Sequence, residues 1–506
     1  MNTIRKKHGK LVKCAVSLLL IAAILCSCAI SGNQVIINPN AANSINNANG
    51  AGNESSANAG RNSNNVNNNT NNVSGNTNSA VPGNNTDNTG NIEVPGGNNT
   101  ANTNNSGNNT NNNTNSVNNN DNTGNNTNNS GNESSNTNTV EPVPKTWAEE
   151  TIEKMSLTEK IGQLFIIRPE QLAFSWDIET QHSLNIGAIE FTDEMKANIK
   201  DYPAGGFILF EKNFKDPDQT KDFIAEFSEY SALIPFIAID EEGGTKVSRL
   251  ANSYNKGIEV PIVPAMGEIG ESGDTSKAQE AGETISEYLK QYGFNLNFAP
   301  IADLDDSDSE GVIGDRSFGT DPQQVADMIK AFITGMHKNG ILSCLKHFPG
   351  HGHAEIDTHA DYSEKIDTWQ ELLHSDVIPF KENKDLTDMI MLSHISFPNV
   401  TGTNLPTTLS KVLTTSKLRN ELNFKGVIIT DSFHMGAIIN TYTSDLAAVM
   451  AIKAGADIIL MPDDYEKAFN AIRAAVDTGE ISEQRINDSV LRILNLKEKL
   501  IPDDKI

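Results

Sequence analysis

About eight short apolar runs recur between residues 163 and 460, and they restrict the possible folds more than any other feature of the chain. Continuous apolar runs of this length are typical of strands that are buried on both faces, as in a parallel sheet. The expected strands are Gln163–Ile167, Gly206–Phe210, Phe236–Ile239, Leu296–Ala299, Ile341–Leu345, Met389–Leu392, Val427–Ile429 and Asp457–Leu460. Eight strands are the number that closes a small parallel barrel.

Helical patterns separate these runs. Asp321 and Pro322 provide an N-cap and a proline at the first helical position, and apolar residues then follow at helical spacing. Similar start signals occur at Asp216 and Ser156. The alternation predicts an α/β protein, and the count favours a TIM-type (β/α)8 barrel over an open doubly wound sheet. A phosphate-binding glycine loop follows none of the runs, which disfavours a nucleotide-binding fold.

Composition divides the chain into three segments. Residues 1–28 have a basic start and an apolar run, Ala15–Leu25, that is short for a membrane span and typical of a secretory signal peptide. Residues 29–143 are mostly Asn, Gly, Thr and Ser, so we expect a disordered linker that cannot bury a core. Residues 144–506 have the composition of one globular domain.

The end of the signal segment, Leu25–Cys28, resembles a bacterial lipoprotein signal, which makes Cys28 the expected lipidation site. An uncleaved anchor or an ordinary secretion signal is the alternative. We expect an exported protein that is lipid-anchored at the extracellular face of the cell membrane, with a linker that lets the domain reach into the cell wall. The net charge of −26 argues against nucleic acid as a partner.

Cysteine usage indicates a globular part without an internal disulfide. Three of the four cysteines lie in the leader, and only Cys344 lies in the globular segment. Because Cys344 is within an apolar run, we expect it to be a buried packing residue and not a nucleophile.

Polar residues gather where the expected strands end. Asp240 and Glu242 follow one strand, Asp303 follows the next, and Asp431 follows a later one. Residues 346–359, KHFPGHGHAEIDTH, combine four histidines, one lysine and two acids with glycine and proline, which hold a loop in a fixed shape. The carboxyl ends of barrel strands share one mouth, so these groups should line one site for a hydroxyl-rich ligand such as a sugar. For any single residue, a structural salt bridge or a helix cap is an equally good explanation.

As a set, these motifs resemble glycoside hydrolase family 3, in particular its single-domain β-N-acetylhexosaminidases of the NagZ type. The resemblance covers about Met155 to Pro462, and the motifs that carry it are Ile239–Leu250, Arg316–Gly319, Lys346–Gly352, Asp357–His359 and Ile429–Asp431. It implies a retaining enzyme that removes terminal N-acetylglucosamine from peptidoglycan-derived glycans through a covalent glycosyl-aspartate, with no cofactor and no metal.

The resemblance also implies a role for each site residue. Asp431 would be the nucleophile and His359 the general acid/base, oriented by Asp357. The sugar hydroxyls would be held by Asp240, Arg249, Arg316, Lys346 and His347. The chemistry agrees, because a strand-end carboxylate suits nucleophilic attack and an imidazole can protonate a leaving oxygen near neutral pH.

Three other functions stay open at this point. A metal hydrolase could use His347, His351, His353, Asp357 and His359, although barrel metal sites usually take ligands from several strands. A family member of different specificity, either a β-glucosidase or a phosphorylase, would share the same motifs. A non-catalytic wall-binding lipoprotein is the third possibility, and the joint presence of Asp357, His359 and Asp431 argues against it.

Overall fold

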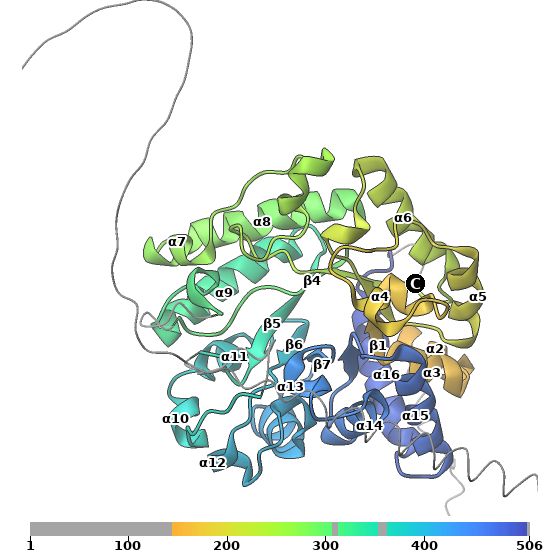
Figure 1. Ribbon diagram of the computed structural model, residues 1–506. Coiled ribbons are helices and arrows are strands. Elements are labelled where there is room, and N and C mark those ends of the chain that lie inside the picture. Colours follow the sequence, from red (N-terminus) through yellow and green to blue (C-terminus); the bar gives the residue numbers. More distant parts are fainter. Residues whose placement is uncertain (1–143, 306–311, 353–361, 503–506) are drawn as a thin grey trace, which may run out of the picture. The chain divides into compact units, whose positions relative to one another are not determined.

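The computed structural model describes residues 144–305, 312–352 and 362–502, which form a closed barrel of eight parallel strands. Each strand pairs with its neighbours in chain order, and β1 pairs with β8 to close the barrel. Figure 1 shows the strands at the centre of the domain with the helices arranged around them. The strands are β1 Phe165–Ile167, β2 Gly206–Ile208, β3 Phe236–Ile239, β4 Leu296–Asn297, β5 Leu342–Phe348, β6 Met389–Leu392, β7 Val427–Ser432 and β8 Ile458–Leu460. The predicted (β/α)8 fold is therefore confirmed.

Two strands run further than their apolar residues indicate, and both carry site residues. β5 continues through Lys346 and His347 because Phe348 still pairs with Leu392 of β6 after a shift in register. β7 continues to Ser432, which pairs with Leu460 of β8. At the first strand the prediction began too early, since Gln163 is the last residue of the preceding helix. Cys344 is fully buried in β5, as predicted.

Helices follow the strands and begin at the residues that their caps indicate. The Asp321 carboxylate accepts from the Gln324 backbone N–H at 2.8 Å, and Asp216 caps the helix after β2 in the same way. The helices are α2 Trp147–Lys154, α3 Leu157–Gln163, α4 Ile178–His182, α5 Asp193–Asp201, α6 Pro217–Tyr230, α7 Met266–Glu271, α8 Thr275–Tyr292, α9 Pro322–His337, α10 Trp369–Leu373, α11 Ile378–Asn383, α12 Pro398–Thr401, α13 Gly436–Ile439, α14 Ser444–Ala454, α15 Tyr465–Asp477 and α16 Glu483–Glu498.

Short 3-10 helices and one π-helix complete the connections. They are η1 Pro169–Leu172, η2 Glu211–Asn213, η3 Ala251–Lys256, η4 Gly314–Arg316, η5 Thr407–Leu409 and the π-helix η6 Val412–Glu421. Most of them lie in the loops after the strands, so they shape the mouth of the barrel.

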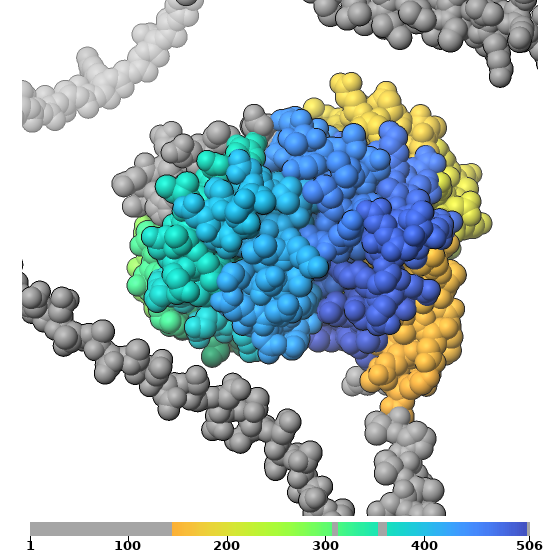
Figure 2. All heavy atoms as spheres, turned by 90° about the horizontal axis from the view of Figure 1, so that it is seen from below, coloured from red at the N-terminus to blue at the C-terminus, as the bar shows by residue number. Residues whose placement is uncertain are grey.

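The two ends of the described domain pack together. α2 and α3 contact α16, and α3 also contacts α15. Figure 2 shows this junction, where the orange N-terminal helices lie beside the blue C-terminal helices. No helix within the described residues has both the length and the apolar character needed to cross a membrane.

Candidate active site

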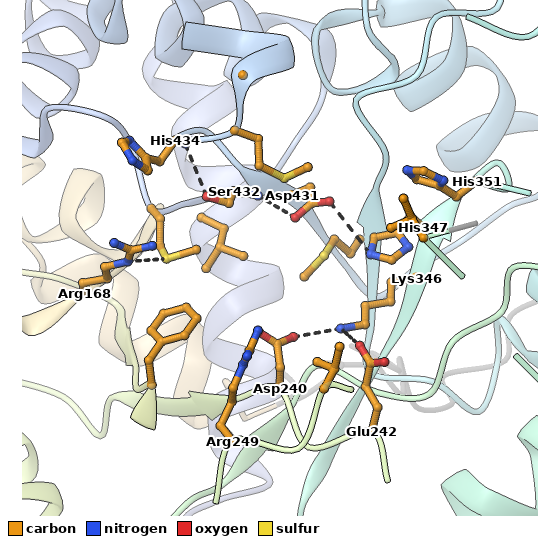
Figure 3. Close-up of a pocket in the computed structure, with 18 of the residues that line it drawn as sticks. Arg168, Asp240, Glu242, Arg249, Lys346, His347, His351, Asp431, Ser432 and His434 are labelled. Carbon is orange, nitrogen blue, oxygen red and sulfur yellow. Dashed lines mark hydrogen bonds and ion pairs between the residues drawn. The ribbon is translucent and has the colours of Figure 1, made fainter. Parts of the chain in front are cut away.

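A cavity of about 590 Å³ opens where the strands end. Its walls include Asp240 after β3, Lys346 and His347 at the end of β5, and Asp431 at the end of β7. Figure 3 shows these side chains converging on one space from different strands. Charged groups from well-separated parts of the chain therefore share one concave site, as the fold predicts for the carboxyl face of a barrel.

Lys346 is the buried cation at the centre of one wall. Its side chain is 3% exposed, and Nζ donates to Asp240 Oδ1 at 2.8 Å and lies 2.5 Å from Glu242 Oε1. Burial alone would lower the pKa of the ammonium, but Asp240 and Glu242 raise it above its ordinary value. Lys346 therefore stays charged and serves as a fixed donor toward the cavity.

Glu242 forms ion pairs with both Lys346 and Arg316, which is one of the predicted sugar-binding residues. Its carboxylate accepts from Arg316 Nε at 2.7 Å and from Arg316 Nη2 at 2.9 Å, which is the bidentate geometry of a strong charge-assisted pair. Although burial would raise the pKa of the Glu242 carboxyl, Arg316 and Lys346 hold it at about 2. Burial would lower the pKa of the Arg316 guanidinium, but the charge of Glu242 raises it above its ordinary value.

Asp303 fixes the orientation of His347. It is fully buried and accepts from His347 Nδ1 at 2.7 Å, from the His347 backbone N–H at 3.1 Å and from the His351 backbone N–H at 2.6 Å. His347 holds the pKa of the Asp303 carboxyl below its ordinary value, although burial would raise it. The remaining nitrogen, His347 Nε2, then faces Asp431 Oδ2 at 3.9 Å. This distance is longer than a direct hydrogen bond, so a substrate hydroxyl lying beside the two groups could contact both.

The loop after β5 depends on a close backbone approach. Gly350 has a φ of +132°, and a Cβ atom at that position would lie 2.4 Å from the Cβ atom of Asp376. Only glycine fits there. Gly350 thus turns the chain sharply after β5, and His351 lines the cavity. Burial lowers the pKa of the His351 imidazole to about 4, so His351 is neutral near pH 7.

Asp431, the predicted nucleophile, is partly exposed to the cavity. Its side chain is 16% exposed and lines the cavity, and Oδ1 accepts from the Ser432 backbone N–H at 2.7 Å. The β7 backbone holds the carboxylate in place while the other oxygen points toward His347 (Figure 3). A carboxylate that is held this way can attack an electrophilic carbon bound in the cavity.

Arg249 lies on the opposite wall, beside Phe210. Its Nη1 donates to Glu211 Oε1 at 3.2 Å, and its guanidinium carbon lies 5.5 Å from the centre of the Phe210 ring. Its Nε is buried and has no hydrogen-bond partner among the residues that the structure describes. The pKa of Arg249 is raised, because Asp240 and Glu211 outweigh the effect of burial.

Six of the predicted site residues line this one cavity. They are Asp240, Arg249, Arg316, Lys346, His347 and Asp431. The predicted acid/base pair, Asp357 and His359, lies outside the described residues, as do His353 and the predicted lipidation site Cys28. Their roles stay predictions.

Sequence reasoning missed three groups that shape the site. Glu242 and Asp303 were noted at strand ends without a role, and their function depends on partners far along the chain. Arg168 was not noted at all. It follows β1 directly and lines the cavity, and a charged residue immediately after an apolar strand was the available signal.

Within the described residues, one group of side chains has the composition of a metal site. Nitrogens of His182 and His434 and an oxygen of Asp463 lie within 4.8 Å of one another. However, the two imidazole rings stack at 3.6 Å with planes 6° apart. The lone pair of an imidazole nitrogen lies in its ring plane, so one ring would have to turn before both could bind the same ion.

Comparisons with known proteins agree with this fold. The model of the glycosyl hydrolase family 3 N-terminal domain matches residues 156–496. A β-hexosaminidase from Hydrogenovibrio crunogenus is 33% identical over 299 residues, which cover 58% of this chain and 81% of that protein. One from Idiomarina loihiensis is 31% identical over 312 residues, covering 61% and 91% respectively. A solved family 3 β-N-acetylglucosaminidase from Paenibacillus sp. FPU-7 matches the structure with a TM-score of 0.61 at 32% identity. The match covers 69% of this chain and 67% of that chain.

The barrel, the carboxylate-lined cavity and these relatives together identify the protein as a glycoside hydrolase. The chain belongs to glycosyl hydrolase family 3.

Proposed function

We propose that the protein is a retaining, exo-acting β-N-acetylglucosaminidase that forms a covalent glycosyl-aspartate at Asp431. The observation that carries the specificity is the identity of 31–33% to β-hexosaminidases over most of their length. The charged groups around the cavity agree with it, since they are fixed donors and acceptors suited to sugar hydroxyls.

In the proposed reaction, Asp431 attacks the anomeric carbon while the bond to the leaving oxygen breaks. His359, oriented by Asp357, gives its proton to that oxygen and then accepts a proton from the water that releases the sugar. Lys346, Asp240 and Arg316 hold the hydroxyls, and their buried ion pairs keep them in place during both steps.

The proposed substrate is a peptidoglycan-derived glycan with a terminal N-acetylglucosamine. This rests on the exported, lipid-anchored location that residues 1–28 and the Asn-rich linker predict. Metabolic labelling with a fatty acid tests the anchor, because Cys28→Ser should abolish incorporation of the label.

A panel of 4-nitrophenyl glycosides tests the sugar specificity. We expect the N-acetyl-β-glucosaminide to be hydrolysed faster than the β-glucoside, with no dependence on added phosphate. Faster hydrolysis of the β-glucoside would contradict the proposed specificity and indicate a β-glucosidase. A rate that depends on phosphate would indicate a phosphorylase. Mass spectrometry of muropeptides, before and after incubation with the protein, then tests the natural substrate.

Two variants test the catalytic roles. Asp431→Ala should remove turnover while the protein stays folded, and unchanged hydrolysis would exclude Asp431 from the mechanism. A 5-fluoro glycosyl fluoride should label Asp431 in the wild type, since it slows release of the covalent intermediate. His359→Ala should slow substrates with poor leaving groups more than those with good ones, and an equal loss would argue against a proton donor.

A further inference from the structure

Arg168 is a buried cation on the β1 side of the catalytic cavity. It is 6% exposed, follows β1, and lies across the cavity from His347 and His351 (Figure 3). Its Nη1 donates to the His182 carbonyl at 3.1 Å, and its Nε donates to Met461 Sδ at 3.1 Å. These contacts hold the guanidinium in place but supply no negative charge.

Among the described residues, no carboxylate lies within salt-bridge distance of Arg168, in contrast to the other two arginines of the cavity. Arg316 is paired with Glu242, and Arg249 with Glu211. Burial lowers the pKa of Arg168, and Glu170 opposes that effect from a greater distance. Glu170 is itself 3.5 Å from Lys212 Nζ. A buried charge without a counter-charge is costly, so its presence beside a ligand cavity indicates that a ligand supplies the charge.

A second arginine donor faces the same wall. Arg168 and Arg249 both contact Phe210, with guanidinium carbons 4.9 Å and 5.5 Å from the ring centre. Arg168 and Arg249 thus place two guanidinium groups, each with several N–H donors, around one ring at the cavity wall.

We propose that Arg168 and Arg249 form a subsite for an oxyanion carried by the substrate, either a carboxylate or a phosphate ester. The proposal rests on the proposed function, because it assigns an acidic substituent to the glycan that this enzyme cleaves. Planar guanidinium groups bind both oxyanions through paired N–H donors, and a desolvated site strengthens these bonds.

The neighbouring histidines favour an anion over a metal ion at this wall. Burial lowers the pKa of His182 to about 4, so the ring is neutral at pH 7, and Arg168 Nη1 lies 3.5 Å from its Nδ1. A cation that bound His182 would sit beside the positive guanidinium of Arg168. An oxyanion would instead meet two arginines.

Calorimetric binding to the full-length protein tests the subsite independently of turnover. One pair of probes is N-acetylmuramic acid and its methyl ester, which differ in a carboxylate charge. The other pair is N-acetylglucosamine 6-phosphate and N-acetylglucosamine. The readout is the affinity ratio within each pair, measured for the wild type, Arg168→Gln and Arg168→Lys. Arg473→Gln is the matched control, because Arg473 also lies over a phenylalanine ring, 5.6 Å from the centre of Phe469, but does not line the cavity.

We expect at least one anionic probe to bind about 10- to 100-fold more tightly than its neutral partner in the wild type and in Arg473→Gln. Arg168→Gln should bring the ratio close to one, and Arg168→Lys should keep part of it, which preserves the test if the glutamine variant does not fold. The pair that responds identifies the substituent as carboxylate or phosphate. A wild-type ratio near one for both pairs, or a ratio that survives in Arg168→Gln, would overturn the proposal. Hydrolysis of the neutral 4-nitrophenyl substrate tests the proposed function separately.

Discussion

Replacing Glu242 by glutamine should destabilise the protein by about 3 kcal/mol at neutral pH. The substitution keeps the shape of the side chain but removes the charge that pairs with Arg316 and Lys346. Lowering the carboxyl pKa from 4.5 to about 2 corresponds to about 3 kcal/mol in favour of the charged folded form. Breaking a buried ion pair typically costs roughly 3 to 5 kcal/mol, which agrees with the loss expected for Glu242→Gln.

The pH dependence gives the prediction a sign. Because the folded pKa is depressed, the stabilisation is fully present above pH 4.5 and is lost as the pH falls toward 2. The difference in unfolding free energy between wild type and Glu242→Gln should therefore shrink from about 3 kcal/mol at pH 5 to about 1.5 kcal/mol at pH 3. Denaturant unfolding at both pH values measures it.

Glu283→Gln is the control for this experiment. Glu283 pairs with Lys338 at 2.6 Å, but both side chains are 46% exposed, so its loss should cost less than about 1 kcal/mol. Activity should fall by about 100-fold in Glu242→Gln only, since Arg316 and Lys346 lose their fixed positions. A cost below about 1 kcal/mol at pH 7, or a cost that does not change with pH, would refute the reasoning.

Three further predictions follow from the same contacts. Asp303→Asn should lower kcat/KM by about 100-fold or more and alter the pH profile, because the amide cannot hold the His347 tautomer; a stability loss with unchanged kinetics would contradict this positioning role. Burial lowers the pKa of Lys497 from 10.5 to about 7. Between these pH values the unfolded chain therefore binds a proton that the folded chain lacks. The free energy of unfolding contributed at this position should rise by about 2 kcal/mol from pH 7 to pH 9. The difference between wild type and Lys497→Met, from denaturant unfolding at both pH values, should show that rise. EDTA should leave hydrolysis unchanged, since the proposed mechanism uses only carboxylates and an imidazole; activity that is lost and then restored by Zn²⁺ would favour the metal hydrolase.

The sequence alone determined the architecture and the side of the barrel that carries the site. Apolar runs such as Phe236–Ile239 and Met389–Leu392 coincide with β3 and β6, because burial on both faces leaves a continuous apolar pattern in the chain. Capping residues marked helix starts in the same local way. Asp240, Lys346 and Asp431 could be assigned to one site because the carboxyl ends of all barrel strands face the same mouth.

Only the tertiary structure decided which charges pair and which are left over. Lys346 meets Asp240 across 106 residues, Arg316 meets Glu242 across 74, and His347 meets Asp303 across 44. The extension of β5 to Phe348 likewise depends on pairing with β6. In the sequence Arg168 is an ordinary charged residue, and only barrel closure places it in the cavity, where no carboxylate of the described residues lies within salt-bridge distance. Local patterns determine local structure, whereas the balance of buried charge is a property of residues brought together from distant parts of the chain.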